Sequence, residues 1–296
     1  MPLDESKLAE RALFPTILIA AEVSAEIVLL HVVVPLNIAL ILPEASFTHA
    51  EEEAERCLTA ICTRFAAVGV TMATDVVVGS GAATAVINYA QENDVDLIAI
   101  SSHGRSGLTR WRYGSVTARL LRQASYPVLV IPDQTGDEPF PFRRILVPLD
   151  GSEIAAQALE PATALALALS AELVLLRAVS LPLMALEPLA TERSIEQIEA
   201  EACDKALAYL EQVKTSLTAA HDAPVKTEAI TGSVADVIID YAGEHDVDLI
   251  AMASHGRSGV LLWTYGSVTE KVLFGTDRAV MVVRRKSTPF LKEHWT

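Results

Sequence analysis

Two segments of this chain have residue types and a spacing that could hold a phosphate group. In one of them, residues 253–256 (Ala-Ser-His-Gly) end an apolar run, nine residues follow, and Gly266-Ser267 opens a helical pattern. In the other, residues 101–104 (Ser-Ser-His-Gly) are followed by nine residues and then by Gly114-Ser115. A glycine lets the backbone approach an oxyanion closely, and a helix N-terminus presents free N–H groups with a favourable dipole. The pattern predicts two phosphate cradles; the alternative is a tight turn followed by a serine that caps the helix.

The side chains beside these glycines have different chemistry. Arg105 and Arg257 follow a glycine directly and could neutralise phosphate charge, and a solvated loop arginine is an equally good interpretation. His103 and His255 have neither an Asp/Ser arrangement nor a second ligand at metal spacing nearby. We therefore predict that the histidines pack or form hydrogen bonds within the loop, without a catalytic or metal-binding role.

Two aspartates, Asp4 and Asp150, stand at the carboxyl end of a predicted first strand. Ligands bind at this edge of an open parallel sheet, and a carboxylate there can accept a hydrogen bond from an adenine amino group or a ribose hydroxyl. The alternative role is to cap the following helix, for which Ser6 and Ser152 compete. We favour the ligand-binding role.

These residues belong to a repeat that covers the whole chain. Residues 94–117 and 246–269 are identical at 18 of 24 positions, and residues 1–33 align with 147–179 without a gap. Between its two matched segments, 147–179 and 246–269, the second repeat has six residues more than the first, around residues 182–196. The repeat predicts four parts, which are a domain over 1–132, a polar, Pro-rich linker over 133–142, a second domain over 143–285 and a tail over 286–296.

The second repeat shows the full series of elements. The pattern predicts strands over 144–149, 172–179, 225–230, 248–253 and 279–283, and helices over 152–169, 192–219, 234–244 and 266–275. The strands are mostly apolar throughout, which is typical of parallel strands buried on both faces by helices. The predicted fold class is α/β, with two tandem doubly wound parallel-sheet (Rossmann-like) domains.

The first repeat lacks most of its first strand. It begins at Met1, where the second repeat has Val147, so the run Arg-Arg-Ile-Leu over residues 143–146 has no counterpart. The first strand of a doubly wound sheet is usually central, so its loss leaves backbone groups of both neighbouring strands unpaired. A start upstream, a damaged half or a strand supplied by a partner would each account for this; we favour an upstream start or a truncated chain.

Composition limits the classes of function. The net charge of −15 over 296 residues disfavours nucleic acid and anionic membrane as partners. The two most apolar stretches, 13–43 and 162–186, contain glutamates and divide into a helical run and a strand, so we expect no membrane span. The acidic start does not fit a signal peptide, and the three cysteines fit neither a disulfide framework nor a metal site. A cytoplasmic protein with reduced cysteines is expected.

The chain resembles the universal stress protein family over nearly all of both repeats. The resemblance rests on V-P-L-D-G-S at 147–152, S-H-G-R-S-G after an apolar strand, and G-S-V-T before a helix. The nucleotide-binding branch of that family has a loop of the form G-x-x-G-x9-G-[ST]. Both repeats match its later positions, whereas Ser101 and Ala253 replace its first glycine.

The resemblance implies an adenine-nucleotide site in each repeat, for ATP with or without Mg²⁺. The aspartate after the first strand would meet adenine or ribose, a valine at the end of the second strand would line the base pocket, and the loop would hold the phosphates. The expected contacts in the first repeat are Asp4, Val33, Ser101, His103, Gly104, Arg105, Gly114, Ser115 and Val116. Those in the second repeat are Asp150, Val179, Ala253, His255, Gly256, Arg257, Gly266, Ser267 and Val268. The resemblance also implies that the last strands, 128–131 and 280–283, pair as a pseudo-twofold dimer within one chain, and it allows a homodimer.

The leading hypothesis is a tandem universal stress protein that binds ATP and acts as a regulatory or stress-response module, with the second repeat as the better site. At most slow ATP hydrolysis is expected, because no general base is identifiable. The competing hypothesis is a structural or partner-binding stress protein in which the Gly-rich loop is only a turn. An adenylate-forming or ATP-pyrophosphatase enzyme ranks lower, because such enzymes carry S-G-G-x-D-S where residues 150–153 are D-G-S-E.

Overall fold

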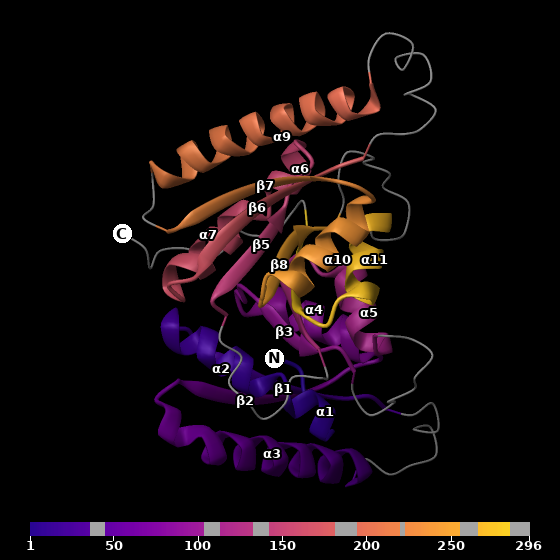
Figure 1. Ribbon diagram of the computed structural model, residues 1–296. Helices are drawn as coiled ribbons and strands as arrows, with labels where there is room; N and C mark the ends of the chain where they lie inside the picture. The colour runs from indigo at the N-terminus through magenta and orange to yellow at the C-terminus, as the bar shows by residue number, and fades with distance from the viewer. Residues whose placement is uncertain are drawn as a thin grey trace. The chain divides into compact units, whose positions relative to one another are not determined.

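The computed structural model describes residues 1–35, 45–103, 113–132, 142–180, 194–219, 223–254 and 266–284, the side chains of 45–47 excepted (Figure 1). The chain divides into two compact units, of which unit 1 comprises residues 1–140 with 286–296 and unit 2 comprises residues 141–285.

Unit 2 contains a parallel sheet with the strand order β7-β6-β5-β8-β9. Its strands are β5 (Arg144–Pro148), β6 (Glu172–Val179), β7 (Val225–Thr231), β8 (Leu249–Ala253) and β9 (Ala279–Val283). The chain moves outward from β5 to β7, returns to the other side of β5 for β8, and then reaches β9. The carboxyl ends of β5 and β8 therefore flank the switch point at which open α/β sheets bind ligands.

The strands of unit 2 are buried on both faces, as their continuous apolar runs predict. Ile145, Leu146 and Val147 in the central strand β5 are all 0% exposed. Helix α9 contacts β6 and β7, and helix α10 contacts β6 and helix α11. These helices are α9 (Ile195–Thr218), α10 (Val234–Glu244) and α11 (Ser267–Gly275). The doubly wound α/β fold predicted from the sequence is confirmed.

A proline divides the first helix of each unit in two, so the prediction of one helix over 152–169 was wrong. A proline ring clashes with the carbonyl group four residues before it. Pro161 stands four residues after Gln157, the C-cap at which the first short helix of unit 2 ends. Pro15 stands in the same relation to the C-cap Arg11 in unit 1. The four helices are α1 (Lys7–Glu10), α2 (Leu13–Glu22), α6 (Glu153–Ala156) and α7 (Leu159–Ala168).

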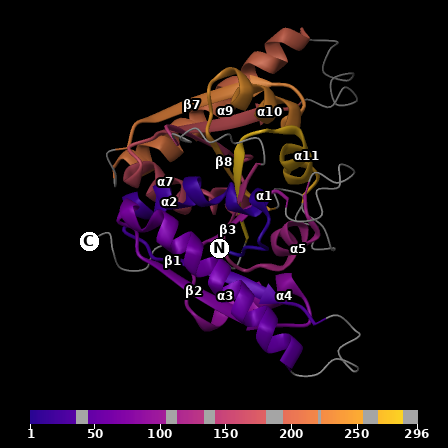
Figure 2. The ribbon, with the colours of Figure 1, turned by 90° about the horizontal axis from the view of Figure 1, so that it is seen from below.

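Unit 1 has the same kinds of elements but a divided sheet. Strands β1 and β2 form a two-stranded parallel sheet, and β3 pairs in parallel with β4. Helix α3 contacts β1 and β2 and lies across them (Figures 1 and 2). The strands are β1 (Ile27–Val33), β2 (Met72–Val78), β3 (Ile98–Ser101) and β4 (Val128–Ile131). The longer helices are α3 (Ala45–Phe65), α4 (Ala82–Glu92) and α5 (Ser115–Gln123).

The sheet of unit 1 is divided because its first strand is reduced to residues 1–3. These residues still join β1, since Leu3 N donates to Leu30 O at 2.9 Å and Leu30 N donates to Met1 O at 2.9 Å. In unit 2, β5 reaches β8 through residues 145 and 146, which pair with 249 and 250. Among the described residues, β1 and β3 are not joined through a central strand, and residues 1–3 pair with β1 alone.

The chain's amino group takes the place of a strand amide in unit 1. Met1 N donates to Val28 O at 2.7 Å. Burial lowers the pKa of this amine from 8.0 to about 5, because the charged form loses its hydration. The amine is therefore neutral in the folded chain near neutral pH.

Gly151 should be far less tolerant of a side chain than Gly243, which gives a stability test of the turn after β5. Gly151 has φ +84°, and a Cβ there would lie 3.3 Å from Arg177 Nη1. The Gly151→Ala variant should lose about 1 kcal/mol or more of unfolding free energy, because the left-handed conformation is strained for an L residue. Gly243→Ala should instead gain up to about 1 kcal/mol, because Gly243 lies in α10 and nothing beyond its own helix backbone lies within 4 Å of the added Cβ. Urea unfolding of both variants measures the two changes, and equal shifts would contradict the prediction.

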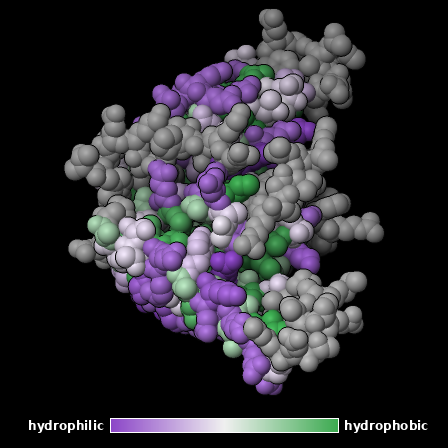
Figure 3. Space-filling view, turned by 90° about the horizontal axis from the view of Figure 1, so that it is seen from above, coloured by the Kyte–Doolittle hydropathy of each residue, from purple (hydrophilic) through white to green (hydrophobic). Residues whose placement is uncertain are grey.

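Three further sequence predictions can be compared with the structure. Cys57, Cys62 and Cys203 are all free thiols. Within the described ranges, no helix is long and apolar enough to cross a membrane, and no group of His, Cys, Asp and Glu side chains could hold a metal ion. Hydrophobic residues on the face drawn in Figure 3 lie among hydrophilic ones.

Candidate functional site

Each unit has a cavity at the carboxyl ends of its strands. The cavity of unit 2 has a volume of 530 Å³ and lies between the ends of β5, β6 and β8, the start of α11 and one side of α9. The cavity of unit 1 has a volume of 290 Å³ and lies between residues 2–4, the ends of β1 and β3, and the starts of α4 and α5. Both cavities occupy the edge of the sheet at which the sequence predicted a ligand.

The structure brings the described site residues of the second repeat together at one cavity. Asp150 lies at one side, after β5, and Val179 ends β6. Ala253 ends β8, and Gly266 and Ser267 lie at the start of α11. The predicted residues that line this cavity are Asp150, Val179, Ala253, Gly266, Ser267 and Val268. His255, Gly256 and Arg257 lie outside the described residues.

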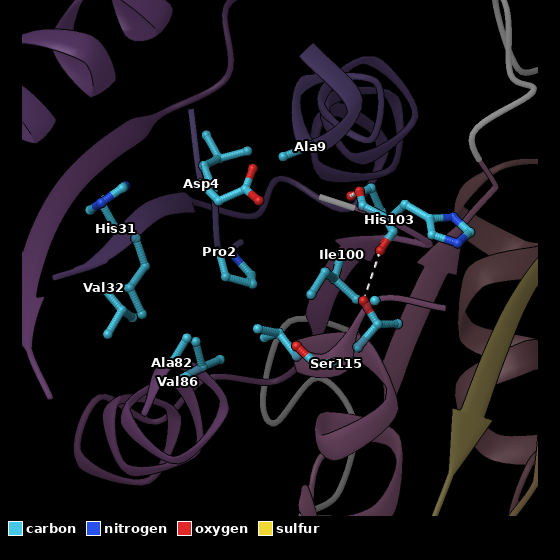
Figure 4. Close-up of a pocket in the computed structure, with 16 residues that line it drawn as sticks. Pro2, Asp4, Ala9, His31, Val32, Ala82, Val86, Ile100, His103 and Ser115 are labelled. Atoms are coloured by element: carbon cyan, nitrogen blue, oxygen red, sulfur yellow. Dashed lines mark hydrogen bonds between the residues drawn. The ribbon is translucent and has the colours of Figure 1, made fainter. Parts of the chain in front are cut away.

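The first repeat gives a similar but smaller arrangement. The predicted residues that line its cavity are Asp4, Ser101, His103, Gly114, Ser115 and Val116. Asp4 and Ser115 lie on opposite sides of the cavity (Figure 4). The valine of β1 that lines the cavity is Val32, whereas the predicted Val33 is not among the lining residues. Gly104 and Arg105 lie outside the described residues.

The hydrogen bonds at the helix starts show whether Asp4 and Asp150 are N-caps, which was the alternative to a ligand-binding role. Ser152 Oγ accepts a hydrogen bond from Ala155 N at 3.1 Å, so the serine is the N-cap of α6. Asp150 Oδ1 accepts from Ser152 N at 2.9 Å and thereby fixes the turn before the helix. Unit 1 repeats this arrangement, with Ser6 as the N-cap of α1 and Asp4 accepting from Ser6 N at 3.1 Å. The aspartates orient the cap without being the cap, and both of them line a cavity.

Ser115 and Ser267 are not the N-caps of their helices, although the sequence analysis considered that role for them. Gly266 is the N-cap of α11, and Ser267 is its first helical residue. Gly114 and Ser115 have the same positions at α5. A glycine cap has no side chain that could accept a hydrogen bond from the N–H groups of the first turn. Among the described residues, no side chain therefore caps the start of this helix at the cavity.

A threonine clamps the start of this helix to the end of the preceding strand. Gly266 N donates to Ser254 O at 2.8 Å, and the buried Thr269 Oγ1 donates to Ala253 O at 3.1 Å. In unit 1, Gly114 N donates to Ser102 O at 2.8 Å and Thr117 Oγ1 donates to Ser101 O at 3.0 Å. The clamp fixes the helix N-terminus with respect to the sheet edge. The sequence prediction missed these threonines, although both belong to the strongly repeated segment.

His103 lies within the loop network of unit 1, as predicted. Its Nδ1 lies 3.4 Å from Ser102 Oγ, and its carbonyl oxygen accepts a hydrogen bond from Ser101 Oγ at 2.5 Å. The buried hydroxyl of Ser101 thus stabilises the turn at the position of the family's first glycine.

The cavities also contain residues that the sequence prediction missed. Arg177 and Lys205 line the cavity of unit 2, and His31 lines that of unit 1. The Arg177 guanidinium lies 5.0 Å from the centre of the Tyr209 ring. Burial raises the pKa of Tyr209, so its hydroxyl stays neutral at physiological pH. The position of Arg177 near the end of the second strand was a usable signal, whereas Lys205 gave none, because it lies in a long polar helix.

The sequence pattern of the universal stress protein family matches residues 1–132 and again residues 141–284. The chain belongs to the universal stress protein family. The two matches coincide with the two repeats, so it is a tandem member.

Curated relatives carry the same family name. Universal stress protein Rv2005c of Mycobacterium tuberculosis is 29% identical over 194 residues, which cover 65% of this chain and 63% of the relative. The chain thus matches somewhat less than two thirds of that relative's length. Universal stress protein YxiE of Bacillus subtilis is 33% identical over 150 residues, which cover 48% of this chain and 99% of the relative. A single-domain universal stress protein therefore corresponds to about half of this chain.

A solved structure supports the fold of the whole chain. The universal stress protein of Archaeoglobus fulgidus superposes with a TM-score of 0.71 at 21% identity, covering 96% of this chain and 97% of the other. At this identity the likeness concerns the fold alone.

Proposed function

We propose that this universal stress protein binds ATP or a related adenine nucleotide in unit 2 and acts as a regulatory or stress-response module. The observation that carries the proposal is the cavity between Asp150 and the N-terminus of α11. A carboxylate that accepts from a sugar or base on one side, and free N–H groups that receive an anion on the other, match the two ends of a nucleotide.

The proposed contacts follow from this geometry. The phosphates lie at the start of α11, beside Gly266 and Ser267, where the dipole of the helix favours negative charge. The ribose or adenine meets Asp150, and Val179 contacts the apolar face of the base. Any Mg²⁺ would be held through the phosphates, because the described residues contain no cluster of metal-binding side chains.

The difference between the two cavities supports unit 2 as the better site. Ligand pockets in proteins are about 300–1,000 Å³ in volume. The cavity of unit 2, at 530 Å³, falls within this range, whereas the 290 Å³ cavity of unit 1 falls just below it.

Equilibrium dialysis of the purified chain with ATP tests the proposal. We expect one ATP per chain at low ligand concentration, occupying unit 2. One solved universal stress protein is described as a complex with cAMP, so cAMP is a useful second ligand. Absence of binding at millimolar ATP would contradict the proposal and favour a structural or partner-binding role, which the replacement of the first loop glycine by Ser101 and Ala253 supports. A nucleotide that co-purifies with the chain would exclude that alternative.

The remaining sequence predictions stay predictions. They are a cytoplasmic location, which the three free thiols favour, pairing of the two repeats through their last strands, and a homodimer.

A further inference from the structure

The cavity of unit 2 contains two cations that the ATP proposal does not use. Arg177 lies in β6 near its carboxyl end, and Lys205 lies on the side of α9 that reaches the cavity. Among the residues that the structure describes, neither side chain forms an ion pair. Two unpaired cations at one cavity are unexpected in a chain with a net charge of −15. They point to an anionic ligand group at this place.

Arg177 is held in a fixed position beside Asp150. Its guanidinium stacks on the Tyr209 ring at 5.0 Å, a cation–π contact that leaves the edge N–H groups available. The same group lies over Gly151, since a Cβ on that glycine would be 3.3 Å from Nη1. An arginine fixed in this way can present two parallel N–H donors to a phosphate.

The fold does not require these cations, because unit 1 has other residues at the same positions. The burial of Ala54 and Leu58 in α3 matches that of Ala206 and Leu210 in α9, which fixes the alignment of the two helices. With this alignment, Arg177, Lys205 and Tyr209 correspond to His31, Glu53 and Cys57. The pair of cations is thus a property of unit 2 alone.

The cations lie apart from the phosphate position of the proposed nucleotide. The phosphates lie at the start of α11, which follows β8, whereas Arg177 lies on β6, two strands away across β5. Neighbouring strands are about 4.8 Å apart, so the backbones of β6 and β8 are about 10 Å apart. The Arg177 guanidinium reaches over the Gly151 turn, which is the ribose side of the proposed nucleotide. Asp150 lines the same cavity, and its single negative charge offsets only one of the two positive charges.

We propose that unit 2 selects an adenine nucleotide whose ribose carries a second phosphate, at the 2′ or 3′ position, and that Arg177 and Lys205 bind this phosphate. The inference rests on the proposed function and names its ligand class. In nucleotide-binding α/β sheets, a carboxylate binds the hydroxyl of an unphosphorylated ribose, whereas an arginine near the ribose accommodates a phosphate on it. Arg177 lies over the Gly151 turn, and with Lys205 it supplies more positive charge than Asp150 offsets. The volume of 530 Å³ leaves room for the additional group.

Isothermal titration with three probes tests the inference. The probes are AMP, adenosine 3′,5′-bisphosphate and adenosine 2′,5′-bisphosphate, with ATP titrated in parallel. We expect at least one bisphosphate to bind about tenfold or more tightly than AMP, as charge-assisted hydrogen bonds to arginine and lysine allow. The double variant Arg177→His/Lys205→Glu, which has the residues of unit 1, should remove this preference, measured as the ratio of the bisphosphate affinity to the AMP affinity of the same variant. Lys214→Ala is the matched control, since Lys214 is on the same helix but does not line the cavity, and it should keep the preference.

Each outcome has a separate meaning. ATP binding without a bisphosphate preference, or a preference that persists in the double variant, overturns the inference and leaves the proposed function standing. If ATP does not bind at all, the proposed function fails and the inference fails with it. Loss of the preference in Lys214→Ala would assign the effect to long-range charge and would likewise overturn the role of Arg177 and Lys205.

Discussion

Replacement of Asp150 by asparagine should weaken ATP binding to unit 2 by about tenfold to a hundredfold, because a hydrogen bond from the ligand to a carboxylate contributes about 1.5–3 kcal/mol. The amide oxygen of asparagine can still accept from Ser152 N, the bond that holds the turn at 2.9 Å. The stability of unit 2 should therefore change by less than about 1 kcal/mol. Isothermal titration with ATP measures the affinity, and urea unfolding measures the stability.

The chain supplies two matched controls for this variant. Asp4→Asn makes the same change at the equivalent turn of unit 1 and should leave the tight binding in unit 2 unaltered. Ser152→Ala removes the N-cap of α6 and should cost about 1 kcal/mol of stability with little effect on affinity. If Asp150→Asn binds ATP as tightly as the unchanged chain, Asp150 does not contact the ligand and its role is confined to the turn.

An extension of Arg-Arg-Ile-Leu before Met1 should stabilise unit 1, and most strongly at low pH. The added residues supply the positions of 143–146, which in unit 2 connect β6 with β8. They also convert the buried amine, whose pKa burial lowers to about 5 in the folded chain, into an amide. The unfolded chain binds a proton on this amine below pH 8, whereas the folded chain binds one only below about pH 5. The buried amine therefore lowers the unfolding free energy by its full amount below pH 5 and does not lower it above pH 8. Three pKa units correspond to about 4 kcal/mol, the gain that the extension should give at pH 5.

A Gly-Ser-Gly-Ser extension separates the two contributions. This extension also converts the amine of Met1 into an amide. Between pH 5 and pH 8 it should therefore reduce the pH dependence of the unfolding free energy as much as Arg-Arg-Ile-Leu does. It adds no apolar strand. Hydrogen exchange of the amides in β1 and β3 should slow only with Arg-Arg-Ile-Leu, because only this strand can pair with both neighbours. A pH slope that neither extension alters would show that the amine is solvated in the folded chain.

Much of the fold could be predicted because the same pattern occurs twice. Apolar strands buried on both faces have a sequence signature that does not depend on distant contacts, as β5 and β8 show. The helix break before Pro161 was missed, since the apolar pattern continues through it and only the steric clash with the carbonyl of Gln157 interrupts the helix.

The N-cap residues of the helices at the site could not be predicted from the sequence. Whether Asp150 or Ser152 caps α6 could not be decided from adjacent polar residues, because both side chains can accept a hydrogen bond from the backbone. The turn geometry decided it, since Ser152 Oγ meets Ala155 N while Asp150 meets Ser152 N. Likewise, Gly266 rather than Ser267 proved to be the cap of α11.

The sequence by itself determined the tandem repeat, the doubly wound class and the position of the two Gly-rich segments, because these follow from local periodicity and from the identity of the two copies. The tertiary structure alone decided how the two cavities differ. Arg177 and Lys205 come from different elements and meet at one cavity because β6 and α9 pack together. The sequence near either residue does not predict that they meet. The meeting depends on how the crossover helix α9 packs against the parallel strand β6, which brings residues distant in sequence together.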